Sequence, residues 1–222
     1  MRILLISLLL FASSASAQSP PSVDCDAAKN STVPVELAYH GQDGTRNVVQ
    51  VYPEKPGDYV VWRRETLPPT RPNPSVFVMK GTFADGGLAS GEMWTTFVGK
   101  HSHRTVKYAP DGLPRNFDHR SDVIYKMHSV TTDGDGTTED KNSTLSYRFK
   151  SEEKILIGSC VLQAIHGETD VINDAGRARH SFQIYFPDLR ISATSNDAEP
   201  IVDGISTVFS EIKPAASSAA TR

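Results

Sequence analysis

One segment, residues 144–192, constrains the fold of this chain more than any other. Apolar and polar residues alternate in it from 144 to 150 and again from 179 to 186. Such alternation places successive side chains on opposite faces of a β-strand, with one face in water. No proline interrupts residues 115–186, so backbone pairing can continue through this stretch. The segment predicts the central part of an antiparallel sheet.

The rest of the chain contains further candidate strands, separated by turn-forming residues. They are residues 32–39, 46–52, 58–67, 75–84, 90–98, 102–109 and 119–131. Residues 133–142 predict a hairpin tip, because their glycines accept positive φ. Residues 155–165 are apolar on both faces, so we expect one central strand that is covered on both sides. Together these patterns predict an all-β domain, a single antiparallel meander curled into a half-barrel or sandwich.

Residues 197–212 leave two interpretations open. Ile201, Ile205 and Phe209 recur at helical spacing, which favours one short C-terminal helix. Gly204 and the β-branched Val208 weaken a helix and favour a strand. The sequence alone does not decide between them.

The first residues follow the pattern of a secretory signal peptide. Arg2 gives a positive start, residues 3–12 are apolar apart from Ser7, and residues 15–17 form an A-x-A cleavage site. The apolar run is shorter than the ~20 residues that span a bilayer. We therefore expect a soluble exported protein of the bacterial periplasm or exterior. The expected divisions are a signal peptide at 1–17, a flexible N-terminal leader at 18–31, a β-rich domain at 32–213 and a disordered tail at 214–222.

The chain has two cysteines, Cys25 and Cys160. In an oxidising compartment two cysteines most simply form one disulfide, which here would fasten the leader to a core strand. A redox pair would need a C-x-x-C motif, which the sequence lacks. Charged residues of both signs are interleaved and the formal net charge is −3, so the sequence does not predict nucleic-acid binding.

Two groups of side chains are candidates for a site. His101 and His103 would share one face of a strand at a spacing that zinc sites use, with a further ligand required from a neighbouring strand. The aromatic residues would either fill a core or line a cavity for an apolar ligand. The ligand-binding candidates among them are Trp62, Trp94, Tyr147, Phe182 and Tyr185. The sequence has no G-x-S-x-G motif and predicts no cofactor and no catalytic residue.

Three stretches, SYRFK at 146–150, IGSC at 157–160 and IYFPDLRIS at 184–192, resemble exported β-rich proteins of proteobacteria. Some of those proteins have a curved antiparallel sheet similar to that of the periplasmic lipoprotein carriers. The resemblance implies a half-barrel that can hold an acyl chain.

Three functional hypotheses follow from these patterns. The first is an exported binding or carrier protein for an apolar or lipid-like ligand. The second is a structural or protein-interaction component of the cell envelope. The third is a metal-dependent hydrolase that uses His101 and His103. A cavity rimmed by aromatic residues would separate the first hypothesis from the second.

Overall fold

The computed structural model describes residues 25–29, 34–52, 59–66, 75–84, 89–97, 100–109 and 118–207. Its elements are α1 (Cys25–Lys29), β1 (Val35–His40), β2 (Arg46–Tyr52), β3 (Tyr59–Thr66), β4 (Ser75–Ala84), β5 (Ala89–Phe97), β6 (Lys100–Ala109), β7 (Val123–Asp133), β8 (Thr138–Ile157), β9 (Cys160–Asn173), β10 (Ala178–Phe186), β11 (Ile191–Ser195) and β12 (Ile201–Thr207). The predicted signal peptide, most of the leader and the tail lie outside the described residues. No helix in the described part of the chain is long and apolar enough to cross a bilayer.

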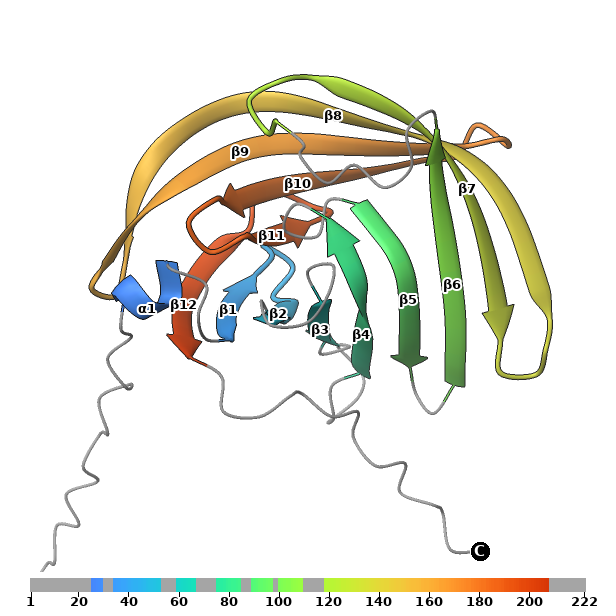
Figure 1. The fold of residues 1–222 in the computed structure, drawn as a ribbon, viewed down its shortest axis with the longest axis horizontal. Coiled ribbons are helices and arrows are strands. Elements are labelled where there is room, and N and C mark those ends of the chain that lie inside the picture. The colour runs from blue at the N-terminus through green and yellow to red at the C-terminus, as the bar shows by residue number, and fades with distance from the viewer. Residues whose placement is uncertain are drawn as a thin grey trace, which may run out of the picture.

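The twelve strands form one antiparallel sheet in the order β11-β10-β9-β8-β7-β6-β5-β4-β3-β2-β1-β12. Strands that follow each other in sequence are neighbours from β1 to β11, and β12 returns to pair with β1 (Figure 1). This arrangement confirms the predicted all-β meander. Of the two interpretations of residues 197–212, the strand is correct for Ile201–Thr207, and residues 208–212 are not described.

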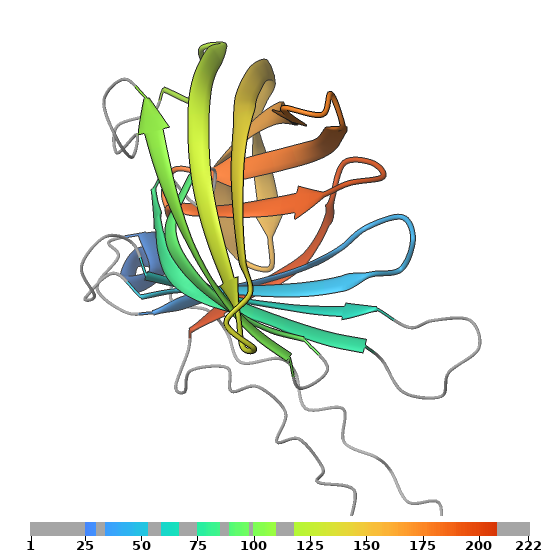
Figure 2. The ribbon, with the colours of Figure 1, turned by 90° about the vertical axis from the view of Figure 1, so that its right-hand side faces the viewer.

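The sheet curls into a nearly closed, barrel-like shape, seen from two sides in Figures 1 and 2. The edge strand β11 lies against β1 and β2 without pairing with them. Just beyond β11, Asp197 accepts a hydrogen bond from the backbone N–H of Asp43 in the β1–β2 turn (2.8 Å). The Ser195 hydroxyl and this N–H hold the pKa of the Asp197 carboxyl below its ordinary value. Charge-assisted contacts of this kind hold the segment that follows the edge strand β11 against the β1–β2 hairpin.

The long strands β8 and β9 arch over the other strands, and a β-bulge between Phe149 and Ser151 bends β8. Asp122 accepts a hydrogen bond from the Phe149 N–H (2.8 Å) at this bulge, so the disturbed backbone keeps a partner there. The buried face of β9 also changes along the strand. Leu162 and Ala164 are buried on one face, whereas Gly167 and Thr169 are buried on the other.

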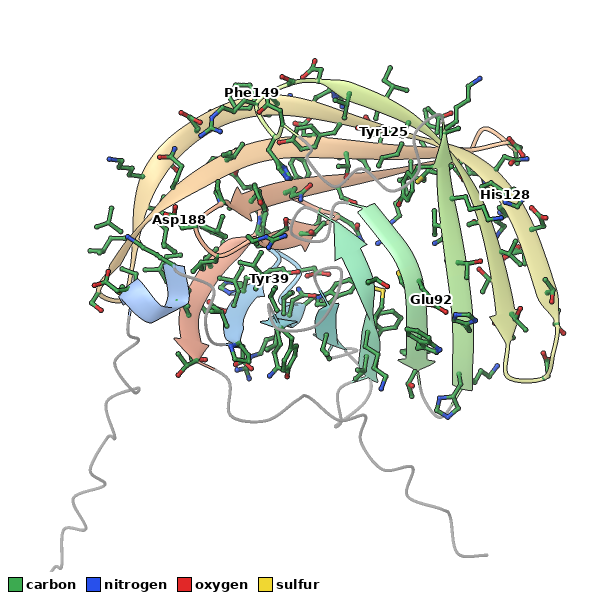
Figure 3. All side chains as sticks on the ribbon, viewed as in Figure 1. Tyr39, Glu92, Tyr125, His128, Phe149 and Asp188 are labelled. Carbon is green, nitrogen blue, oxygen red and sulfur yellow. A yellow bond between two sulfur atoms is a disulfide. The ribbon has the colours of Figure 1, made fainter. Side chains whose placement is uncertain are left out.

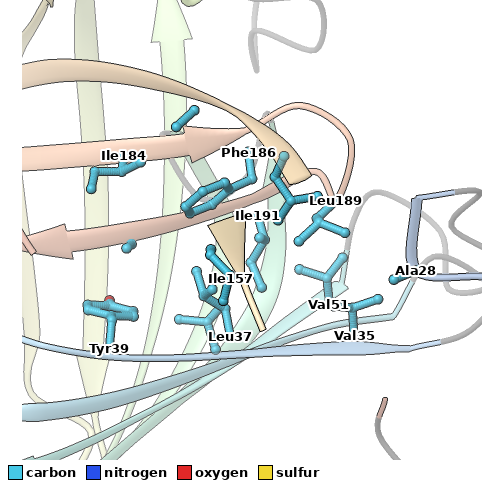
Figure 4. Packing of buried hydrophobic residues seen from close by; sticks show 14 of the residues in the cluster. Ala28, Val35, Leu37, Tyr39, Val51, Ile157, Ile184, Phe186, Leu189 and Ile191 are labelled. Carbon is cyan, nitrogen blue, oxygen red and sulfur yellow. The ribbon is translucent and has the colours of Figure 1, made fainter. Parts of the chain in front are cut away.

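The change of face in β9 serves two hydrophobic clusters. The first lies between the inner faces of β1 and β2 and the strands β8 to β11, with Leu37 of β1 below Phe186 and Ile191 (Figure 4). The second joins Val106, Tyr108, Met127 and Leu145 from β6, β7 and β8. The strand β9 thus contributes to both clusters, which explains why it has apolar residues at both even and odd positions.

The single strand predicted over residues 155–165 is wrong. Gly158 and Ser159 form a turn between β8 and β9, and Ile157 pairs with Cys160. Gly158 has a φ of 61°, a conformation that glycine adopts without a steric penalty. Ile157, Cys160 and Leu162 of this hairpin belong to the first cluster, whereas Leu156 and Val161 are exposed on the opposite face. The expected cover on both faces is therefore wrong at this hairpin as well. A hairpin turn does lie within the predicted tip 133–142, with Gly136 at a φ of 87°, but it covers only residues 134–137, and residues 138–142 already belong to β8.

The predicted disulfide is confirmed. Cys25 of α1 is bonded to Cys160 at the start of β9, 135 residues apart in sequence. Ala28 of the same helix is buried in the first cluster, so α1 is held by both a covalent bond and packing. Among the described residues there is no free cysteine. A disulfide of this kind points to an oxidising compartment.

Candidate functional site

A row of aromatic side chains crosses three neighbouring strands on the inner face of the sheet. Trp62 of β3 and Phe77 of β4 meet edge to face, with ring centroids 5.6 Å apart. Phe77 is paired directly with Phe97 of β5, and their centroids are 6.4 Å apart. We call Trp62, Phe77 and Phe97 the aromatic row. Their contacts fall within the distance range of favourable aromatic pairs.

The aromatic row has one end in the core and the other in solvent. Trp62 packs against the first hydrophobic cluster, together with Met79 of β4. Phe77 is only half-buried, and Phe97 is 45% exposed. Inner-face neighbours of the row include two thioethers, Met79 and the buried Met93 of β5. Methionine side chains adapt their shape readily, so this surface can fit flexible apolar partners.

Trp94, the other tryptophan among the predicted ligand contacts, lies on the opposite, outer face of the sheet, on β5. It is 42% exposed and stacks on His103 of β6, with centroids 5.1 Å apart. The Nε2 atom of His103 lies 2.9 Å from a carboxylate oxygen of Glu92, which is labelled in Figure 3. His101 lies two residues along β6, with Nδ1 3.1 Å from the Thr96 hydroxyl. The two predicted metal ligands therefore share one face, as their spacing indicated.

Within the part of the chain that is described, no three His, Cys, Asp or Glu side chains gather where they would hold a metal ion. The ring nitrogens of His101 and His103 that have hydrogen-bonding neighbours face a hydroxyl and a carboxylate. A metal role for this pair stays a prediction from the sequence.

Tyr147 and Tyr185 are brought together around His119, which precedes β7. The His119 ring stacks on Tyr185 at a centroid distance of 3.7 Å and meets the Tyr147 ring edge to face. The Tyr147 hydroxyl donates a hydrogen bond to the His119 carbonyl (2.9 Å). All three residues are buried. Burial raises the pKa of the Tyr147 phenol, and the negative charges of Asp118 and Asp122 raise it further.

Tyr147 is expected to stay protonated at pH values where an ordinary tyrosine, with a pKa near 10, ionises. Because its pKa is raised in the folded state, its contribution to stability is complete below about pH 10 and is lost as the pH rises further. Alkaline titration of tyrosinate absorbance should be the same for native wild type and Tyr147→Phe up to about pH 11. In urea, where the chain is unfolded, the absorbance change of the variant should correspond to one tyrosine fewer than that of wild type. If native Tyr147→Phe gave a smaller rise in tyrosinate absorbance than native wild type below about pH 11, the prediction would be wrong.

Phe182 of β10 lies apart from both aromatic groups. Its ring meets His180 edge to face at 4.8 Å, and His180 lies 2.7 Å from an Asp170 oxygen. Arg148 joins the same charged network through Asp170 at 2.8 Å and Glu168 at 3.2 Å. The five predicted ligand residues therefore do not form one surface, and only Tyr147 and Tyr185 meet, through His119. Their role in ligand binding stays a prediction.

Within the aromatic row, Trp62 is a predicted ligand contact and Phe97 is one of the aromatic residues expected to fill a core or line a cavity, whereas Phe77 is not predicted. The sequence shows that Phe77 and Met79 are two positions apart, as are Met93, Thr95 and Phe97. It indicates a shared face within each strand. The register between β4 and β5, which sets Phe77 opposite Phe97, is the missing information.

A hollow of about 430 Å³ also lies over β6, β7 and β8, with Asp174 at its rim. Its outward-facing side chains are Lys107, Lys126, His128, Asn142 and Thr144. His128 is paired with Asp140 at 2.7 Å. These outward-facing side chains end in charged or polar groups, unlike the rings of the aromatic row.

Comparison with known proteins assigns no relative to this chain. No family model matches it, and neither a curated protein nor a solved structure does. A functional assignment therefore rests on the described side chains themselves.

Proposed function

We propose that this protein is an exported binding or carrier protein for an apolar or lipid-like ligand, with the aromatic row as its contact surface. The observation that carries the proposal is the continuity of Trp62, Phe77 and Phe97 across three strands, from the first core to solvent. Sites for small apolar ligands are lined mainly by aromatic and aliphatic side chains. Covering the exposed part of such a row stabilises a complex by about 25 cal/mol per Å² of apolar surface removed from water.

The position of the aromatic row on paired strands favours binding. Trp62 is registered against Met79, and Phe77 against Phe97, by backbone ladders on both sides of β4. Side chains held in this way lose little conformational freedom when a ligand binds, so less of the contact energy is offset by ordering. The row therefore presents a contact surface that is formed before the ligand arrives.

Export is supported by two independent features. The Cys25–Cys160 disulfide is of a kind that persists in oxidising compartments. The sequence begins with the positive, apolar and small-residue regions of a secretory signal. We propose the bacterial periplasm or exterior as the place of action. A carrier for apolar molecules is useful there because such molecules cross an aqueous space poorly.

The two tryptophans provide an internal test, because Trp62 is in the aromatic row and Trp94 is on the outer face. We expect 1-dodecanol to shift the fluorescence of Trp94→Phe, whose remaining tryptophan is Trp62. The fluorescence of Trp62→Phe, which reports from Trp94, should stay unchanged. Saturable binding that moves only the Trp94 signal would place the ligand outside the row and reject the proposed site.

Phe97→Ala is expected to weaken binding of 1-dodecanol about tenfold, because removing one well-packed aromatic contact costs on the order of 1–2 kcal/mol. Ile124→Ala is the matched control, since Ile124 is 73% exposed on the outer face of β7. It should bind like wild type in the same fluorescence titration. Equal losses in both variants would show that binding follows general surface hydrophobicity.

A further inference from the structure

Arg104 lies on the inner face of β6, the same face of the sheet as the aromatic row. In the sheet it is paired with Met93 of β5 on one side and Thr131 of β7 on the other. It shares its face with Val106 and Tyr108, both of which are buried in the second cluster. The guanidinium group therefore belongs to the inner surface, between the two clusters.

Arg104 has no anionic partner in the described part of the chain. Its Nε atom is buried and makes no hydrogen bond there, and no described carboxylate forms an ion pair with it. Other arginines do have such partners: Arg120 lies 2.5 Å from Glu152, and Arg148 contacts Glu168 and Asp170. An arginine stays charged under all physiological conditions, so a half-buried one without an anion destabilises the fold.

The cation and the aromatic row lie on the same inner face of the sheet. Met93, Thr95 and Phe97 share the inner face of β5, and Arg104 is directly opposite Met93. Phe97 is four residues further along the strand, which corresponds to about 14 Å at ~3.4 Å per residue. The inner surface thus runs from an exposed ring, past a thioether, to an unpaired guanidinium.

We infer that the ligand is an anionic amphiphile, a single apolar chain that ends in a carboxylate or a phosphate. This inference rests on the proposed function and specifies its ligand. The chain lies along β4 and β5 against Phe77 and Phe97, and the anionic head accepts hydrogen bonds from Arg104. A guanidinium donates two parallel hydrogen bonds to either anion, and such bonds are stronger inside a protein than in water.

Three ligands that share one chain test the inference: 1-dodecanol, dodecanoate and dodecyl phosphate. In the Trp94→Phe protein, which reports through Trp62, at least one anion should bind at least tenfold more tightly than the alcohol. The tighter of the two anions identifies the headgroup. Adding Arg104→Met should reduce the affinity for that anion to about the level of dodecanol and should weaken dodecanol binding far less than it weakens binding of the anion. Arg104→Lys, which keeps the charge without the fork, should bind the anion with intermediate affinity.

The outcomes separate the inference from the proposed function. If dodecanol binds at Trp62 but neither anion binds more tightly, or if Arg104→Met binds the anion like its parent, the role of Arg104 is rejected and the aromatic site stands. If none of the three ligands binds, the proposed function itself is rejected. The melting temperature of Arg104→Met gives an independent check. It should be unchanged or higher, because an unpaired cation is removed, and a large decrease would show that Arg104 is structural and overturn its role as a ligand contact.

Discussion

Loss of the Cys25–Cys160 disulfide is expected to lower the free energy of unfolding by about 5 kcal/mol. The bond closes a loop of 135 residues, and the entropy that it removes from the unfolded chain gives this value at 25 °C. A domain of this size has a total stability on the order of 5–15 kcal/mol, so much of that total depends on one bond. Urea unfolding of Cys25→Ala/Cys160→Ala against the oxidised wild type measures the difference.

The structure also indicates what is released when the bond is absent. The helix α1 has five residues and is too short to be stable without tertiary contacts. Amide hydrogen exchange near Ala28 should therefore accelerate in the double variant. Ser159→Ala is the control, since its hydroxyl lies near Cys25 and its loss leaves the disulfide intact. A double variant within about 1 kcal/mol of wild type would show that packing around Cys160 holds the N-terminal segment without the bond.

Much of the strand pattern could be predicted from the sequence, because alternation and turn residues are local signals. The strands expected at residues 46–52 and 75–84 coincide with β2 (Arg46–Tyr52) and β4 (Ser75–Ala84). The disulfide could be predicted because two cysteines in an exported chain leave one simple pairing. These features depend on nearest neighbours or on composition, not on how the sheet curls.

The candidate site could be predicted only in part, because it depends on register and curvature. Alternation shows that Trp94 and Phe97 lie on opposite faces of one strand, but not which face turns inward. Trp94 is paired with Lys80, whereas Trp62 is paired with Met79, and this difference places the two tryptophans on opposite sides of the sheet. Only the pairing of β5 with β6 places Arg104 on the same face as the aromatic row. None of these relations can be inferred from one stretch of the sequence alone, because each depends on how two strands are paired.

Gly167→Ala is expected to lower the free energy of unfolding by about 3 kcal/mol, near the upper end for overpacking a core. A Cβ atom at Gly167 would lie 2.4 Å from two atoms of the Tyr147 side chain, Cε2 and the hydroxyl oxygen. The ring cannot move aside without cost, because Tyr147 is 1% exposed and its hydroxyl is bonded to the His119 carbonyl. Displacing it would break a buried hydrogen bond and disturb the stack of His119 on Tyr185.

Gly204→Ala is the matched control for this substitution. Gly204 also lies within a strand, β12, but a Cβ atom there would meet no other atom within 4 Å. Alanine at that position should leave stability within about 0.5 kcal/mol of wild type or raise it slightly, since it restricts the unfolded chain. A double-mutant cycle with Tyr147→Leu then isolates the contact, because the smaller side chain leaves room for the new methyl group. Two results would contradict this explanation: a loss of stability for Gly167→Ala as small as that for Gly204→Ala, or an equal loss in the Tyr147→Leu background. Either result would show that contact with the Tyr147 ring is not the reason for glycine at position 167.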